Sequence, residues 1–343
     1  MGFEKNLTAP ESRTSIAQAS IPEILSEYLA GQLTEGTKRI YQRDIQDFFG
    51  GRTPSLAQLI QLTPRDLNLW RNQVWDNGRG RLEASTINRK LTALKTFYDY
   101  LVGMGIVPLN PANSKVVRRI RVKAWQPQLG LLVEEFQALL QSALSDSDKN
   151  RGMRDYAIMA MGYTGLLRRD ELARATWGDL VQDSGRILLK LPLTKGGAND
   201  FVPVEKPLLR ILDRYFLQVG ETVWRTAWRK RNPNNAWSSE KISDCPIFVA
   251  LDNRCFGHGL SGSAINEIVK RRAVQAGLMA GVHSHTLRHT GITHLLEQNV
   301  SLVRVQELAR HSDPKITMKY FALMGRLKNA PTNVLAKNLE FAP

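Results

Sequence analysis

Apolar residues recur at helical spacing along the N-terminal third of the chain. From Pro22 onward, Ile24, Leu25, Tyr28 and Leu29 form a stripe along one side of a predicted helix. Residues 1–20 have no such stripe, and Thr, Ser, Gln and Pro are frequent among them. This composition predicts a loose tail ahead of the first helix.

Three more helices are predicted in this region, each from a capping residue followed by an apolar stripe. The candidate caps are Thr37, then Thr63, which precedes a proline, and then Ser85-Thr86. The longest helix should bury a set of apolar side chains: Ile87, Leu91, Leu94, Phe97, Tyr98 and Leu101. Residues 21–114 are therefore predicted to form an all-α bundle.

The rest of the chain divides by composition into a linker, a second domain and a tail. Residues 115–130 are basic and lack a clear helical stripe, which predicts a linker. This linker either lies free in solvent or crosses the phosphates of a nucleic acid as a strap. Residues 131–327 are predicted to form the second domain. Residues 328–343 carry a short helical pattern that is too small to fold alone.

Helical and strand patterns alternate in the second domain. The nearly all-apolar run from Met153 to Tyr163 predicts a central buried helix, and another helix is expected from Leu166 to Thr176. Two strands, Ile187–Leu191 and Phe201–Val204, are predicted with a turn at 194–200, followed by a helix over 208–219. Residues 220–245 predict an irregular insertion. The fold class expected is mainly α, a helical bundle plus a mixed α+β domain with a small antiparallel sheet.

Net charge adds a binding partner to this picture. The chain carries 47 Lys+Arg against 32 Asp+Glu, a formal charge of +15. Residues 1–130 hold 18 basic and 11 acidic side chains, or +7, and the remainder holds +8. Two basic halves indicate a polyanion that contacts both. An anionic membrane is the competing partner, but neither a basic amphipathic anchor nor a lipidation motif is visible.

Cysteine usage and hydropathy bear on location. Cys245 and Cys255 are the only cysteines and do not form a C-x-x-C pair. This favours two reduced thiols over a disulfide or a metal site. No signal peptide opens the sequence, and the longest apolar run, Ala157 to Leu167, is too short to span a bilayer. A cytoplasmic protein without membrane contact is expected.

Residues 283–320 concentrate the candidate chemistry. On a helix that begins near Thr286, His285 and Arg288 lie three residues apart, on the side that continues as Ile292. An arginine on an apolar side needs an anionic partner, because guanidinium groups are rarely buried alone. A helix N-terminus also favours a phosphate. The pattern predicts an anion site.

Tyr320 follows on a second helix, which Ser312-Asp313-Pro314 is expected to start. It shares a helix face with Ile316 and Leu323, so its spacing alone is typical of a core tyrosine. A phenol with a pKa of about 10 also loses its proton more readily than an aliphatic alcohol, and so suits nucleophilic attack on phosphorus. Both interpretations are open on spacing alone.

The order and spacing of the motifs resemble the tyrosine recombinase family, which includes phage integrases, Xer-type recombinases and Cre. HTLRH at 285–289, ARH at 309–311 and KYF at 319–321 carry the resemblance. It extends upstream to TGLLRRDEL at 164–172 and TKGGAND at 194–200, and covers essentially the whole chain. It implies a site-specific DNA recombinase that works through a 3′-phosphotyrosine intermediate and a Holliday junction. No metal or cofactor is implied.

The resemblance assigns a role to each motif residue. Arg168 and Arg288 would clamp the scissile phosphate, because guanidinium forks match its geometry, and Tyr320 would be the nucleophile. The other roles implied are proton transfer by His285, protonation of the leaving 5′ oxygen by Lys195, a hydrogen bond from His311 to the phosphate, and support by Glu171. His289 is expected to be a structural histidine beside the site.

The resemblance also implies partners. Residues 21–114 would be a SAM-like core-binding domain on double-stranded DNA, and residues 328–343 would dock on the next protomer of a tetramer on two DNA sites. Candidate DNA contacts are basic residues expected on exposed helix faces and in the linker: Lys38, Arg39, Arg43, Arg89, Lys90, Lys95, Arg118, Arg119 and Arg121. By composition alone, such residues also fit an ordinary solvated surface.

Two alternatives remain open at the level of sequence. A type IB topoisomerase would use similar chemistry. Residues 300–321 also fit a helix-turn-helix, which is typical of a non-catalytic, sequence-specific DNA-binding regulator. His283, His285 and His289 suggest zinc, but the H-E-x-x-H spacing is absent, and no metal is expected.

Overall fold

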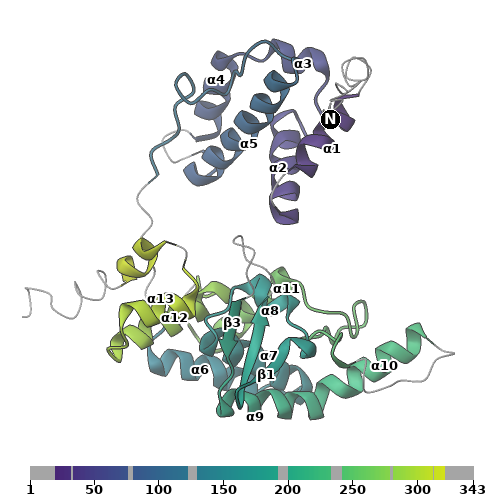
Figure 1. Ribbon diagram of the computed structural model, residues 1–343, viewed down its shortest axis with the longest axis vertical. Helices are drawn as coiled ribbons and strands as arrows, with labels where there is room; N and C mark the ends of the chain where they lie inside the picture. Colours follow the sequence, from purple (N-terminus) through teal and green to yellow (C-terminus); the bar gives the residue numbers. More distant parts are fainter. Residues whose placement is uncertain are drawn as a thin grey trace, which may run out of the picture. The chain divides into compact units, whose positions relative to one another are not determined.

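The computed structural model describes residues 20–31, 34–75, 80–122, 130–191, 200–232, 242–278, 281–311 and 313–320. The chain divides into two units, Met1–Trp125 and Gln126–Pro343, which are described separately below (Figure 1). Within the described ranges, no helix is long and apolar enough to cross a membrane.

Unit 1 is a helical bundle around one apolar core, as predicted. Its helices are α1 (Ile21–Ala30), α2 (Glu35–Phe48), α3 (Leu56–Gln61), α4 (Pro64–Trp75) and α5 (Ala84–Gly103). The predicted stripe of α1 is buried, and so are all the apolar side chains predicted for α5. Tyr98 of α5 donates a hydrogen bond to the carbonyl of Leu59 at 3.0 Å, which ties α5 to α3.

The helix starts of unit 1 differ in detail from the prediction. Thr34 caps α2, because its hydroxyl accepts from the N–H of Thr37 at 3.1 Å; Thr37 itself lies inside the helix. α5 begins at Ala84, so Ser85 lies in its first turn and does not cap it. The unpredicted helix α3 starts with a reciprocal pair of hydrogen bonds between Ser55 and Gln58.

Lys90 was predicted on the exposed face of α5, and this prediction is wrong. Its ammonium lies 3.3 Å from a carboxylate oxygen of Asp44 and 3.0 Å from one of Asp47, both on α2. Asp44 is only 1% exposed and also pairs with Arg89. A carboxylate buried between two helices requires such cations. Lys90 is therefore a structural partner of α2 and does not lie on the exposed face of α5.

The first part of the predicted linker packs on unit 1. Val117 is buried in the core of the bundle. The side-chain amide of Asn88 donates to the carbonyl of Ile120 at 2.8 Å and accepts from its N–H at 2.9 Å. The main chain is thus held on α5 as far as Ile120. The neighbouring basic side chains stay exposed: Arg118, Arg119 and Arg121.

Unit 2 packs helices around a small antiparallel sheet, also as predicted. The strands, in spatial order, are β1 (Leu180–Asp183), β2 (Arg186–Leu191) and β3 (Asp200–Pro203), and Leu189 of β2 lies opposite Leu180 and Val202. The helices are α6 (Val133–Leu144), α7 (Lys149–Thr164), α8 (Arg169–Arg174), α9 (Lys206–Tyr215), α10 (Glu221–Arg231), α11 (Gly262–Gln275), α12 (Ser284–Glu297) and α13 (Leu302–Ala309). Residues 314–320 are helical again.

The insertion predicted as irregular at 220–245 is partly helical. A π-helical turn, Phe216–Gly220, leads from α9 directly into α10. α10 is amphipathic: it buries an apolar stripe of Val223, Trp224 and Ala227, although the helix also contains several arginines. Residues 233–241 lie outside the described part of the chain.

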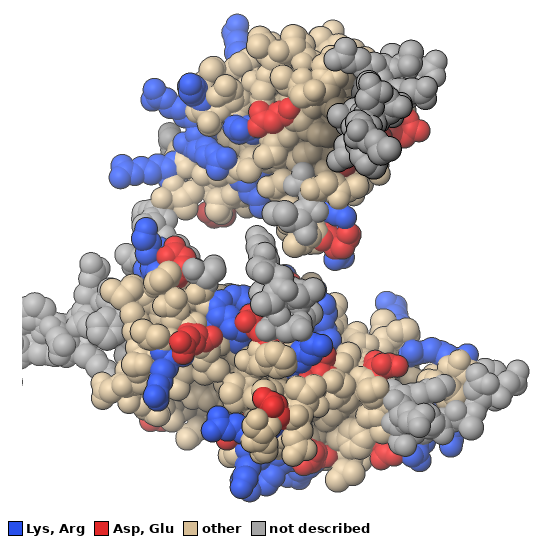
Figure 2. All heavy atoms as spheres, viewed as in Figure 1, with Lys and Arg blue, Asp and Glu red and all other residues tan. Residues whose placement is uncertain are grey.

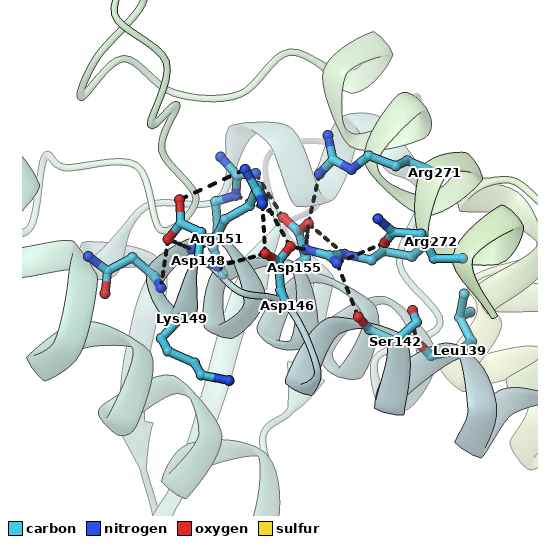
Figure 3. Close-up of polar contacts among 12 residues, drawn as sticks. Leu139, Ser142, Asp146, Asp148, Lys149, Arg151, Asp155, Arg271 and Arg272 are labelled. Atoms are coloured by element: carbon cyan, nitrogen blue, oxygen red, sulfur yellow. Dashed lines mark hydrogen bonds and ion pairs between the residues drawn. The ribbon is translucent and has the colours of Figure 1, made fainter.

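A buried ion-pair network joins α6, α7 and α11 (Figure 3). One oxygen of Asp155 accepts from Nε and Nη2 of Arg154 at 3.0 and 2.8 Å. The other accepts from Arg271 Nη2 and Arg272 Nε, each at 2.8 Å. Arg272, whose side chain is 1% exposed, also lies 2.5 Å from Asp146, which follows α6. The network fixes the start of α7 against the end of α11.

Candidate active site

Helix α12 carries three of the candidate side chains, and its first turn is organised by His283. The Nδ1 atom of His283 accepts from the N–H of Thr286 at 3.3 Å, so α12 begins two residues earlier than predicted. Arg288 and His289 are buried, whereas His285 is exposed. The helix therefore carries a guanidinium into the interior and leaves one imidazole at the surface.

The hydrogen bonds of Arg288 go to main-chain carbonyls. Its two Nη atoms donate to the carbonyls of Leu166 and Ala309. Within the described ranges, no carboxylate forms an ion pair with it. Burial, reinforced by the positive charges of Arg168 and Arg310, lowers the pKa of Arg288 to about 9, so it is still charged at neutral pH. A buried cation held in this way favours an anionic ligand.

Arg168 lies at the start of α8 and is fixed by Glu171. The helix predicted from 166 is shorter, because Leu166 adopts a φ of 47° and the chain turns there. Nη1 of Arg168 lies 2.7 Å from one Glu171 oxygen, and its main-chain N–H donates to the other at 2.8 Å. Nη2 donates to the carbonyl of Arg310 at 3.1 Å. The guanidinium is thus oriented by contacts on two sides.

Tyr320 reaches the same place from the helix at 314–320. It is 2% exposed, and its hydroxyl contacts Nδ1 of His289. The ring lies 6.4 Å from that of His311 and nearly parallel to it, at 12°. Nδ1 of His311 is 2.7 Å from the hydroxyl of Thr317. Burial raises the pKa of Tyr320, although Arg288 opposes the shift, so the phenol is protonated at neutral pH.

His289 and His311 are neutral around pH 7. Burial is the largest cause for both, and neighbouring charges add to it. The pKa is lowered to about 3 for His289 and to about 4 for His311. The rings of His285 and His289 meet edge-on, with centroids 4.4 Å apart. Neutral imidazoles at this position can accept protons.

Positive charge exceeds negative charge here. Arg168 and Arg310 both pair with Glu171, at 2.7 and 2.8 Å, whereas Arg288 contacts carbonyls. Burial opposes ionisation of Glu171, but the two arginines outweigh it and lower its pKa. Figure 2 shows Lys and Arg side chains over the part of unit 2 that contains α8. Several fixed guanidinium groups fit an anion with several oxygens, such as a phosphodiester.

The structure brings most of the predicted site residues together: Arg168, Glu171, His285, Arg288, His289, His311 and Tyr320. Lys195 lies outside the described residues. Sequence reasoning missed Leu166 and Arg310, which both have positive φ. The carbonyl of Leu166 accepts from Arg288, and the carbonyl of Arg310 accepts from Arg168. A left-handed turn is normally signalled by glycine, and neither position has one. The only pointer to Arg310 was its place in the ARH motif.

The predicted DNA contacts of unit 1 fall into separate groups. The exposed candidates are Arg39, Arg43, Arg89, Arg118, Arg119 and Arg121. Two candidates are partly exposed and paired: Lys38 with Glu35 at 2.8 Å and Lys95 with Asp99 at 2.7 Å. Figure 2 shows Lys and Arg side chains gathered on one side of unit 1. With Lys90 excluded, this unit still offers a basic surface.

Histidines that suggested zinc make other contacts. Nδ1 of His283 lies 3.0 Å from the hydroxyl of Thr286, and Nδ1 of His289 contacts Tyr320. In the part of the chain that the structure describes, no group of three or more His, Cys, Asp or Glu side chains could hold a metal ion.

Comparison with known sequences gives matches over both units. The model of the Phage integrase family matches residues 131–325, and the model of the phage integrase N-terminal SAM-like domain matches residues 23–105. A tyrosine recombinase of Synechococcus elongatus is 28% identical over 340 residues, which is 96% of this chain and 97% of that protein. The tyrosine recombinase XerC of Alcanivorax borkumensis is 33% identical over 290 residues, 84% of each chain.

Solved structures show the same fold at lower sequence identity. A lambda integrase dimer bound to a COC′ core site aligns with a TM-score of 0.60 at 17% identity, over 88% of this chain and 95% of that one. A lambda integrase tetramer bound to a Holliday junction has a TM-score of 0.60 at 15% identity, over 88% of this chain and 77% of that one. The Tn1549 transposon integrase in complex with a circular intermediate DNA also has a TM-score of 0.60 at 17% identity, over 90% of this chain and 99% of that one.

Proposed function

The chain belongs to the phage integrase family and is an enzyme of the tyrosine recombinase type, and on this premise we propose that it is a site-specific DNA recombinase. It would cleave one strand at a time, hold the DNA end as a 3′-phosphotyrosine and exchange strands through a Holliday junction. The contacts described above support roles for Arg168, Arg288 and Tyr320, and the other roles rest on the family pattern.

Arg168 and Arg288 bind the scissile phosphate in this proposal. Attack on a phosphodiester loads negative charge on its non-bridging oxygens, and fixed guanidinium forks stabilise that charge. Both groups are already oriented, by Glu171 and by the carbonyls of Leu166 and Ala309. Pre-oriented donors need not reorganise when the charge develops. The arginine pair would thus act mainly on cleavage and less on DNA affinity.

Tyr320 is the proposed nucleophile. Its oxygen forms the bond to phosphorus while the bond from phosphorus to the 5′ oxygen breaks, and the departing oxygen takes up a proton. The phenol proton passes to a neutral imidazole. The contact of Tyr320 with His289 favours His289 as the first acceptor, with His285 beside it. Because burial raises the pKa of Tyr320, proton removal and attack would proceed together.

The remaining roles rest on the family pattern. His311, held through Nδ1 by Thr317, would donate from Nε2 to the phosphate. Lys195, which lies outside the described residues, would protonate the 5′ oxygen. Glu171 would support Arg168. No metal enters this scheme.

The observation that carries the proposal is the meeting of Arg168, Arg288, His311 and Tyr320 around one cationic centre. A non-catalytic regulator would not need Tyr320 to lie beside Arg288 and His289. A type IB topoisomerase would share the chemistry, so strand exchange is the distinguishing test. A supercoiled plasmid with two copies of a sequence selected by binding from random DNA should yield recombined circles. Relaxed circles without exchange would indicate the topoisomerase.

We also propose how the chain is divided in use. Residues 21–114 and the basic linker at 115–130 would clamp one side of the duplex, residues 131–327 would perform catalysis, and residues 328–343 would join protomers in a tetramer on two sites. Deleting residues 328–343 should spare binding to a half-site but abolish cooperative binding and recombination. Cooperative binding by the truncated protein, in a gel-shift titration of full site against half-site, would contradict this assembly.

A further inference from the structure

Arg310 occupies an unusual position between α13 and His311. Its φ of 53° lies in the left-handed region, which a non-glycine residue rarely adopts. Its side chain is nevertheless only 6% exposed and reaches back into unit 2. A disfavoured backbone conformation combined with a buried charge points to a specific role for this residue.

The main chain at this turn holds both arginines of the site. The carbonyl of Ala309 accepts from Arg288, and the next carbonyl along the chain, that of Arg310, accepts from Arg168 at 3.1 Å. Two successive carbonyls thus bind two guanidinium groups that come from different helices. The left-handed conformation at position 310 sets the directions in which these carbonyls point.

The side chain of Arg310 links this turn to the start of α8. Its Nη2 lies 2.8 Å from Glu171 Oε2 and 3.2 Å from the carbonyl of Leu166, and its Nη1 donates to the carbonyl of Leu308 at 2.8 Å. The other oxygen of Glu171, Oε1, holds Arg168 at 2.7 Å. One buried carboxylate is therefore shared between two guanidinium groups.

We propose that Arg310 is a positioning residue that neutralises Glu171 and so leaves the charge of Arg168 available to the scissile phosphate. This inference rests on the recombinase function proposed above. Without the guanidinium of Arg310, the Glu171 carboxylate would be compensated by Arg168 alone. The pair would then be nearly neutral, and Arg168 would bind the developing charge of the phosphate less strongly.

Glycine is the informative replacement at this position. Arg310→Gly removes the guanidinium and accepts the left-handed conformation without strain, so the two carbonyls can keep their directions. Arg310→Asn serves as a second variant, because asparagine also tolerates this conformation and carries no charge. Arg304, exposed on α13, gives the matched control Arg304→Ala. A thermal melt of each DNA-free protein shows which variants are folded at the assay temperature.

The experiment measures single-turnover formation of the covalent adduct on a nicked DNA site, together with the affinity for that site. Arg310→Gly and Arg310→Asn should slow adduct formation about a hundredfold, the scale expected when one electrostatic stabiliser of the transition state is weakened, with little change in affinity. Adding Glu171→Gln should restore much of the rate in either variant, because the glutamine oxygen can still accept from Arg168 whereas the negative charge that offsets Arg168 is gone. A purely structural role would instead make the two substitutions additive.

Each outcome is decisive. A rate within about threefold of wild type in a folded Arg310 variant would overturn the inference and leave the recombinase function intact. So would an unchanged or lower rate on adding Glu171→Gln to a slow Arg310 variant. No adduct from the wild-type protein would overturn the proposed function, and this inference with it.

Discussion

The buried network around Asp155 gives a stability prediction whose size follows from its contacts. In Asp155→Asn, one side-chain oxygen can still accept from Arg154, but an NH₂ group then faces the N–H donors of Arg271 and Arg272. The substitution removes the negative charge and two hydrogen bonds. Breaking one side of a buried ion pair costs about 3–5 kcal/mol. Because Arg272 keeps Asp146 at 2.5 Å, we expect the lower end of this range.

The loss should appear as a lower melting temperature of unit 2. A loss of about 3 kcal/mol in a domain of this size corresponds to roughly 6–12 °C. Differential scanning calorimetry of the full-length protein measures it, with Glu267→Gln as the control. Glu267 forms an exposed pair with Lys270 at 2.9 Å, and its loss should cost about 0.5 kcal/mol or less. A shift for Asp155→Asn no larger than that of the control would show that the network does not stabilise unit 2.

Three further predictions concern the site. Arg168→Lys and Arg288→Lys keep the positive charge but lose the forked donors of the guanidinium. The cleavage rate should therefore fall about 10²–10³-fold with little loss of DNA binding. Near-normal cleavage by both variants would count against binding of the scissile phosphate by these arginines. Cleavage should be unchanged in EDTA, and a loss restored by Zn²⁺ or Mg²⁺ would revive the histidine-cluster interpretation. The pKa of His289 is about 3 in the folded chain and about 6.5 in the unfolded chain. Between pH 3 and pH 6.5 the unfolded state therefore binds more protons, so the free energy of unfolding decreases as the pH falls below 6.5. His289→Asn should remove up to about 1.4 kcal/mol per pH unit of this dependence in DNA-free urea titrations, and an unchanged slope would contradict it.

The sequence predicted the elements whose signals are local and periodic. The stripe on α1 and the long apolar face of α5 are buried as expected, because helical spacing alone decides which side faces the core. Short elements escaped, since α3 and β1 hold six and four residues, too few to establish a period. The stripe of α10 was hidden by its arginines, although Val223, Trp224 and Ala227 have the right spacing.

What the sequence could not give depends on contacts between distant segments. Lys90 looked like a surface lysine because its partners, Asp44 and Asp47, lie more than 40 positions away on α2. The motif order indicated the candidate site residues, but not that Tyr320 would contact His289, nor that Arg310 would share Glu171 with Arg168. Positive φ at a non-glycine residue has no sequence signal, because tertiary contacts impose it.

The central claim is that Tyr320 attacks DNA, and trapping the covalent complex tests it most directly. Wild-type protein and Tyr320→Phe are each incubated with a nicked duplex whose sequence was selected by binding from random DNA. The complexes are denatured in SDS and digested for mass spectrometry. We expect both proteins to bind the duplex, and only the wild type to form an SDS-resistant adduct, with the nucleotide linked to the peptide that contains Tyr320. An adduct formed by Tyr320→Phe, or a nucleotide linked to a different residue, would contradict the assignment.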